Sequence, residues 1–104
     1  MQVIHCTEAH LDVLSELFND YRIFYEQPSD VPACRAFIQK NLQQNCSKIF
    51  LLLDDEGRAV GFSQLYPSIC SISMRPYFYL SDLYVATSTR RNGHARHLMN
   101  YITD

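Results

Sequence analysis

The sequence predicts one α+β domain over residues 1–104, with the element order β-α-α-β-β-β-α and a mixed, mainly antiparallel sheet. Two early segments and one late segment repeat apolar residues at three- and four-residue spacing, which is typical of helices with one buried face. Three apolar and aromatic runs between them are typical of strands. A length of 104 residues with 47% apolar content fits a single compact core.

The N-terminal part is expected to form a short strand and two helices. Residues 2–6 are partly apolar, and Thr7 can cap the helix that follows. The apolar face of this first helix comprises Leu11, Leu14, Leu17, Phe18, Tyr21, Phe24 and Tyr25. Asp30 can cap a second helix with Pro32 in its first turn and an end near Asn45. Its predicted buried stripe is Cys34, Phe37, Ile38 and Leu42.

The middle of the chain predicts a β-hairpin and a third central strand. Residues 48–53 and 59–66 are apolar runs, and the Asp-Asp-Glu-Gly segment at 54–57 has the composition of a turn. After Pro67 we expect a polar connection, because the apolar run stops there. Residues 77–85 then form a long run of aromatic and aliphatic residues, which indicates the third strand.

The most informative stretch joins the end of that strand to a final helix. The helix is predicted by Ala95, Leu98, Met99 and Ile102. Gly93 and Ala95 allow a ligand to approach the backbone closely, and the unpaired N–H groups of a helix start attract anions. Arg90, Arg91 and Arg96 oppose the helix macrodipole, so a bound anion is expected to compensate them; the alternative is ordinary solvated arginines.

The spacing Arg90-x-x-Gly93-x-Ala95, placed after a strand Leu-x-Asp-Leu-Tyr-Val and before an amphipathic helix, resembles the GCN5-related N-acetyltransferases (GNAT). Their cofactor signature is Arg or Gln, two residues, Gly, one residue, then Gly or Ala. Further upstream segments resemble a bacterial subgroup of these acetyltransferases, namely residues 21–25, 27–30, 64–68 and 71–74. The resemblance covers nearly the whole chain and implies a GNAT-like (acyl-CoA N-acyltransferase) fold whose C-terminal strands are absent.

The resemblance also implies an activity: transfer of an acetyl group from acetyl-CoA to a primary amine of a small molecule or peptide, without a metal. The pantetheine arm would lie along the strand and the pyrophosphate on the loop that follows. The cofactor-binding residues so implied are Leu83, Tyr84, Val85, Arg90, Arg91, Asn92, Gly93, His94, Ala95 and Arg96. The tyrosine that usually protonates the leaving thiolate would lie beyond the C-terminus.

The catalytic residues stay unassigned in the sequence. Polyamine-acetylating relatives often have a glutamate where this chain has Ser81, so the neighbouring Asp82 is either a weak candidate for the base or a structural anchor. His94 and His97 are three residues apart but lack an evident third metal ligand, and exposed histidines are the simpler interpretation. Three tyrosines either line an acceptor pocket or pack in the core: Tyr21, Tyr25 and Tyr66.

Charge and composition exclude several other classes of function. Nine Lys and Arg against eleven Asp and Glu, a net charge of −2, do not favour nucleic acid or an anionic membrane as the partner. With neither a membrane span nor a signal peptide, the protein is expected in the cytoplasm. The four scattered cysteines indicate reduced thiols in or near the core. The alternative to an enzyme is a non-catalytic or truncated module that binds acetyl-CoA or oligomerises, and an exposed strand edge predicts a homodimer.

Overall fold

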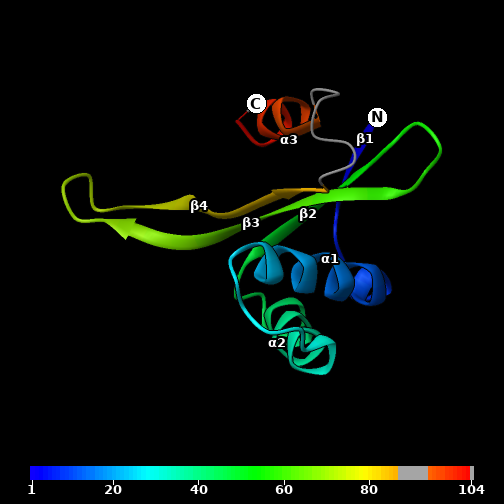
Figure 1. Ribbon diagram of the computed structural model, residues 1–104. Coiled ribbons are helices and arrows are strands. Elements are labelled where there is room, and N and C mark those ends of the chain that lie inside the picture. Colours follow the sequence, from blue (N-terminus) through cyan, green and yellow to red (C-terminus); the bar gives the residue numbers. More distant parts are fainter. Residues whose placement is uncertain (87–93, 104) are drawn as a thin grey trace.

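The computed structural model describes residues 1–86 and 94–103, and its elements follow the predicted order with one added 3-10 turn (Figure 1). The elements are β1 (Gln2–His5), η1 (Glu8–His10), α1 (Leu11–Phe24), α2 (Val31–Gln43), β2 (Lys48–Leu53), β3 (Ala59–Cys70), β4 (Arg75–Val85) and α3 (His94–Thr103). For residues 94, 95, 102 and 103 only the backbone is described. The α+β class is therefore confirmed.

The four strands form a sheet with the order β1-β2-β3-β4, and every neighbouring pair is antiparallel. Figure 1 shows α1 and α2 on one face of this sheet and α3 on the other. Among the described residues β4 has one neighbour and lies at the sheet's edge, so the prediction of a third central strand was wrong here. A strand's apolar composition cannot reveal how many neighbours it has, because β4 would pack its faces in either position.

Local signals placed α2 correctly, whereas Thr7 caps the 3-10 turn η1, and α1 begins after His10, whose side chain does not cap it. The Asp30 side chain accepts a hydrogen bond from the Ala33 N–H at 3.1 Å and so caps α2, whose first turn contains the proline. The predicted stripes differ from the structure at three positions. Phe24 and Tyr25 are 52% and 60% exposed at the end of α1, and Phe37 is exposed on α2, where it stacks on Phe18 with ring centroids 5.4 Å apart. These residues keep helical spacing but extend past the area that the sheet covers.

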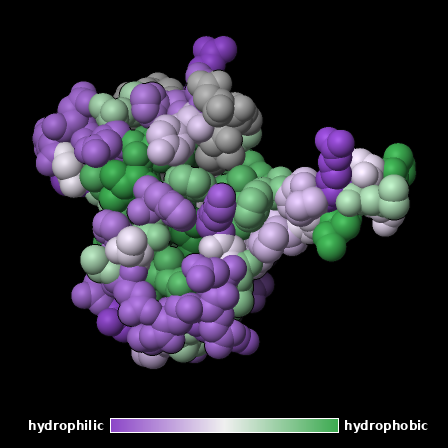
Figure 2. All heavy atoms as spheres, turned by 180° about the vertical axis from the view of Figure 1, so that it is seen from behind, coloured by the Kyte–Doolittle hydropathy of each residue, from purple (hydrophilic) through white to green (hydrophobic). Residues whose placement is uncertain are grey.

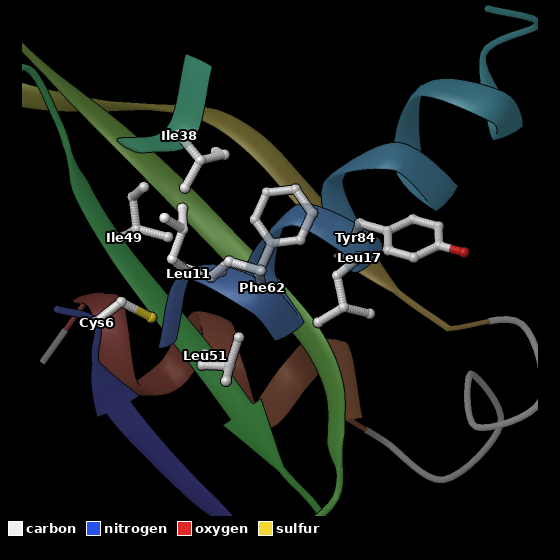
Figure 3. Close-up of a cluster of buried hydrophobic side chains, with 9 residues drawn as sticks. Cys6, Leu11, Leu17, Ile38, Ile49, Leu51, Phe62 and Tyr84 are labelled. Carbon is white, nitrogen blue, oxygen red and sulfur yellow. The ribbon is translucent and has the colours of Figure 1, made fainter. Parts of the chain in front are cut away.

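The main core lies between the sheet and the helix pair α1 and α2 (Figure 3). It contains Cys6, Leu11, Leu14, Leu17, Ile38, Ile49, Leu51, Phe62 and Tyr84. A smaller cluster on the opposite face joins Leu98 of α3 to Leu52 and Val60. Leu98 is fully buried, so α3 is fixed against the sheet by the apolar stripe that the sequence predicted.

Strands β3 and β4 continue well beyond β2 as a two-stranded arm, residues 66–79, which projects from the body of the molecule (Figures 1 and 2). The apolar runs predicted that β3 ends at residue 66 and that β4 begins at residue 77, so the predicted polar connection was wrong. Pairing with β2 stops at Lys48 and Leu65, and beyond that point β3 has one described neighbour. Proline is tolerated in strands of this kind, which explains why Pro67 does not end β3.

The turn between β2 and β3 confirms the prediction for residues 54–57. Asp54 Oδ1 accepts hydrogen bonds from the backbone N–H groups of Glu56 and Arg58, each at 2.9 Å. The Arg58 N–H bond is the largest of the causes that hold the pKa of Asp54 below its usual value. Gly57 has φ of 81°, a left-handed conformation that glycine adopts without steric cost.

The four cysteines are free thiols, but they do not all lie in the core. Cys6 and Cys34 are buried, and burial raises the pKa of Cys6 to about 12. Cys70 instead lies half-buried at the tip of the arm, where hydrogen bonds from the Ser73 side chain and neighbouring backbone lower its pKa. The expectation of thiols in or near the core therefore fails for Cys70, because β3 carries this residue out onto the arm.

Candidate functional site

The end of β4 contains three of the predicted cofactor residues, and the structure places them at the edge of the sheet. Tyr84 and Val85 are buried and Leu83 is half-buried. Their neighbour across the ladder is β3, where Gly61 lies opposite Val85. A side chain at Gly61 would place its Cβ 2.7 Å from the Tyr84 carbonyl oxygen, so this glycine allows the two strands to approach closely.

A β-bulge separates this strand end from the arm. Gln64 pairs with Asp82 and the next residue, Leu65, pairs with Leu80, so Ser81 is an extra residue on β4. Bulges bend a strand and redirect its side chains, and they are frequent beside functional sites. Here the bulge lies just before the predicted cofactor segment and places Asp82 on the face covered by α1 and α2.

The predicted phosphate-binding loop falls largely outside the described residues. Arg90, Arg91, Asn92 and Gly93 belong to the undescribed segment, so their positions are not assigned. His94 and Ala95 form the start of α3, of which the backbone is described, and Arg96 in its first turn is exposed. The helix therefore begins directly after Gly93, as the sequence analysis expected, on the sheet face opposite α1 and α2 (Figure 1).

Asp82 is the acidic residue nearest to the strand end, and both of its carboxylate oxygens accept hydrogen bonds. The Tyr21 hydroxyl on α1 donates to Oδ1 at 3.0 Å, and the Gln64 amide on β3 donates to Oδ2 at 2.8 Å. The pKa of Tyr21 is raised to about 12, first by burial and then by this bond to Asp82. Through these two bonds Asp82 joins α1 to β3.

Gln64 extends the contact into a polar network that links both helices to the sheet. Its amide oxygen accepts from Asn41 Nδ2 at 2.9 Å and from the Ser47 hydroxyl at 2.8 Å. Asn41 also donates to the Tyr66 hydroxyl at 3.2 Å. Gln64 and Asn41 are buried, and neither was predicted as a site residue. The available signal was a polar residue between Phe62 and Tyr66, at a strand position that faces the core.

The three tyrosines considered for an acceptor pocket have different surroundings. Tyr21 is half-buried, with ring centroids 5.5 Å from Phe62 and 5.9 Å from Tyr84. Tyr66 is half-buried and lies beside Tyr79 across the ladder at 6.2 Å. Tyr25 is mostly exposed and contacts Tyr21 edge-to-face at 5.2 Å. Tyr21 therefore belongs to the core and the polar network together, whereas Tyr25 lies outside the core.

Residues 1–86 and 94–103 contain no group of three or more His, Cys, Asp or Glu side chains suited to a metal ion. His97 is exposed, and the His94 side chain is not among those described. No helix within the same residues is long and apolar enough to cross a bilayer.

Comparison with known proteins gives consistent matches. The profile of the Acetyltransferase (GNAT) family matches residues 11–104. A Bacillus subtilis (strain 168) protein, "Uncharacterized N-acetyltransferase YhfO", is 36% identical over 104 residues, which are 100% of this chain and 69% of that protein. A "Probable acetyltransferase" of Haemophilus influenzae is 29% identical over 85 residues, covering 82% of this chain and 58% of that protein.

A solved structure supports the same assignment. The crystal structure of a probable acetyltransferase superposes with a TM-score of 0.92 at 41% identity, over 99% of this chain and 69% of that one. The chain thus spans between 58% and 69% of the length of these three relatives.

Proposed function

The chain belongs to the acetyltransferase (GNAT) family of acyltransferases, and on this premise we propose that it transfers the acetyl group of acetyl-CoA to a primary amine. The observation that carries the proposal is the junction between β4 and α3. The strand ends at Val85 at the sheet edge, α3 begins at His94, and the signature Arg90-x-x-Gly93-x-Ala95 lies across the start of that helix.

The residues of this junction suit the parts of acetyl-CoA. By the family resemblance, the amide-bearing pantetheine arm would lie along residues 83–85 of this strand. The first N–H groups of α3, together with the exposed guanidinium of Arg96, fit a pyrophosphate. Gly93 adds no side chain at the point where that anion would approach. A cytoplasmic location, where acetyl-CoA is available to such an enzyme, is part of the same proposal.

In the proposed reaction acetyl-CoA supplies a thioester, whose carbonyl carbon is attacked by the neutral amine. A C–N bond forms, the C–S bond breaks, the nitrogen loses a proton and the departing thiolate gains one. We assign neither the base nor the acid to a described residue. Asp82 already accepts two hydrogen bonds, which supports an anchoring role over a role as the base.

Calorimetric titration with acetyl-CoA tests the placement of the cofactor. We expect Gly93→Asp to weaken binding by about tenfold or more, because it adds bulk and negative charge beside a pyrophosphate; tenfold corresponds to about 1.4 kcal/mol. Ser71→Asp is the matched control, since it adds the same carboxylate to the exposed turn of the arm. Equal affinity in the two variants would exclude this site.

A second candidate is a module that binds acetyl-CoA or oligomerises without catalysis. It is favoured by the engagement of Asp82, because the carboxylate nearest to the strand end is already hydrogen-bonded to Tyr21 and Gln64. A thiol-release assay with a panel of primary amines separates the two candidates. Turnover of about 1 to 1000 per second indicates an enzyme. Cofactor binding without thiol release indicates the module.

A further inference from the structure

We propose that the groove between α1 and α2 binds a small aromatic carboxylate, with the Arg22 guanidinium as the partner of the carboxylate group. The groove has a volume of about 410 Å³ and is lined by Phe18, Arg22, Ala33, Cys34 and Phe37. This volume lies toward the lower end of the range of about 300–1,000 Å³ that is typical of small-molecule sites. None of the lining residues belongs to the proposed cofactor segment, so the site does not depend on the proposed acetyl transfer.

The Arg22 side chain has a charge without a matching opposite charge. Arg22 is half-buried, and its guanidinium forms one hydrogen bond among the described residues, to Cys34 Sγ at 4.0 Å. The ion pairs within residues 1–86 and 94–103 have the N-terminus, Arg35 and Arg58 as their positive members, and none of them includes Arg22. A guanidinium has five N–H donors in a planar fork, and a neutral thiol is a weak acceptor. Most of the hydrogen-bonding capacity of Arg22 is therefore left for water or for a ligand.

Two aromatic rings form the apolar wall of the same groove. The rings of Phe18 and Phe37 stack with their centroids 5.4 Å apart and an interplanar angle of 7°. Phe18 also contacts the core residue Phe62 edge-to-face at 6.1 Å, whereas Phe37 is 44% exposed. Apolar rings with one charged group among them are typical of a small-molecule site. A flat aromatic ligand can cover the exposed ring of Phe37 and remove its apolar surface from water.

A buried polar residue holds the two walls of the groove together. Asn19 on α1 is 6% exposed, and its Nδ2 donates a hydrogen bond to Ser29 Oγ at 3.1 Å. Asn19 Oδ1 accepts hydrogen bonds from the Asp30 N–H at 2.8 Å and from Cys34 Sγ at 3.8 Å. These bonds fix the start of α2 against α1. The groove is therefore already formed in the free chain, which reduces the cost of ordering on binding.

The charges around the groove favour an anion with a single negative charge. Arg22 is the one cation among the residues that line it. Asp30 lies next to the groove, where its carboxylate accepts a hydrogen bond from the Ala33 N–H, and it adds one negative charge. A phosphate monoester, with a charge near −2, would therefore be repelled more than one arginine offsets. A planar carboxylate has one charge and matches the guanidinium fork with two parallel hydrogen bonds.

The alternative role for Arg22 is to join the two helices through Cys34 and to cover apolar surface with its aliphatic stem. Neither task requires a positive charge, because the sulfur is neutral and an uncharged side chain can cover the same surface. A purely structural arginine would therefore give no preference for a carboxylate over an uncharged ligand of the same shape. A carboxylate site requires that preference, so ligand charge separates the two roles.

An NMR titration of the 104-residue chain with phenylacetate, which has one ring and one carboxylate, tests the inference. We expect backbone amide shifts centred on residues 18–22 and 33–37, and binding that weakens about tenfold or more in Arg22→Gln, a loss of about 1.4 kcal/mol. Arg75→Gln, which neutralises an exposed arginine on the arm, is the matched control and should leave binding unchanged. Ala33→Leu keeps the charge and fills the groove from an exposed position on α2, so it should weaken binding by a similar factor. It decides the matter if Arg22→Gln does not fold.

Two analogues separate the contributions of charge and ring. 2-Phenylethanol has the ring without the charge and acetate has the charge without the ring, so each should bind more weakly than phenylacetate by about tenfold or more. The inference would be overturned by no binding of phenylacetate, by shifts centred elsewhere, by equal affinity for phenylacetate and either analogue, by equal weakening in Arg22→Gln and Arg75→Gln, or by unchanged affinity in Ala33→Leu. If phenylacetate binds and acetyl-CoA does not, the proposed function is wrong and the carboxylate site stands.

Discussion

Replacing Gln64 by leucine tests the polar network directly, because leucine has a similar volume and cannot form its hydrogen bonds. Gln64 is 0% exposed and makes three side-chain hydrogen bonds, to Asp82, Asn41 and Ser47. The bond to the Asp82 carboxylate is a bond to a charged group, which contributes about 1.5–3 kcal/mol. Buried Asn41 keeps its hydrogen bond to Tyr66 but loses the one to Gln64, at a cost of about 1 kcal/mol.

The hydroxyl of half-buried Ser47 can hydrogen-bond to water instead, so losing its bond to Gln64 changes the free energy of unfolding little. The added apolar surface of leucine offsets part of the lost stability. We therefore expect Gln64→Leu to lower the free energy of unfolding by about 2–4 kcal/mol, within a total of about 5–15 kcal/mol for a domain. Urea denaturation followed by circular dichroism measures this as a midpoint lower by about 2–4 M, since the slope for a small domain is about 1 kcal/mol per molar.

Gln43→Leu at the exposed end of α2 is the matched control and should change the free energy of unfolding by less than about 0.5 kcal/mol. A loss below about 1 kcal/mol in Gln64→Leu, with an unchanged denaturant slope, would refute the reasoning. It would mean that the Gln64 amide is not hydrogen-bonded to Asp82 and Asn41 in solution.

Two further predictions concern the arm and the thiols. With iodoacetamide at pH 8, Cys70 should be alkylated before Cys6 and Cys34, because the pKa of Cys70 is lowered whereas the other two thiols are buried. Peptide mass spectrometry gives the order of labelling, and alkylation of Cys6 first would contradict the prediction. We also expect the chain to form a homodimer through the arm, because its exposed side chains are mostly apolar, so that Ile69→Ser with Phe78→Ser gives a monomer. Sedimentation over a tenfold dilution tests this, and a monomeric parent chain would refute it.

Much of the fold was predictable from local patterns. The helical stripe of α1, the Asp30 cap of α2 and the turn at residues 54–57 each depend on interactions between residues close in sequence. The end of β4 at Val85 and the start of α3 after Gly93 were also predicted, because a change from alternating to helical spacing marks them. The family followed from the motif that spans this junction, and the profile match confirms it.

The arm could not be predicted in the same way. Residues 66–76 of the arm contain two prolines and several serines, a composition that predicts a polar connection and not a strand. Whether Pro67 ends a strand depends on the presence of a neighbour on its nitrogen side, and that is decided by where β2 stops. The exposed side chains of the arm, such as Ile72 at 96%, likewise follow from its projection away from the core and not from their hydropathy.

By itself, the sequence determined the order of the elements, the family and the segment proposed for the cofactor, because each of these is indicated by a pattern of residues close together along the chain. The tertiary structure alone decided the surroundings of Asp82. Tyr21 is 61 residues away from Asp82 and Gln64 is 18 residues away, and no periodicity relates these positions. They meet because α1 packs across the sheet and a bulge at Ser81 sets the register of β4 against β3. Burial then makes their hydrogen bonds necessary, since a polar group removed from water must find its partner inside the protein.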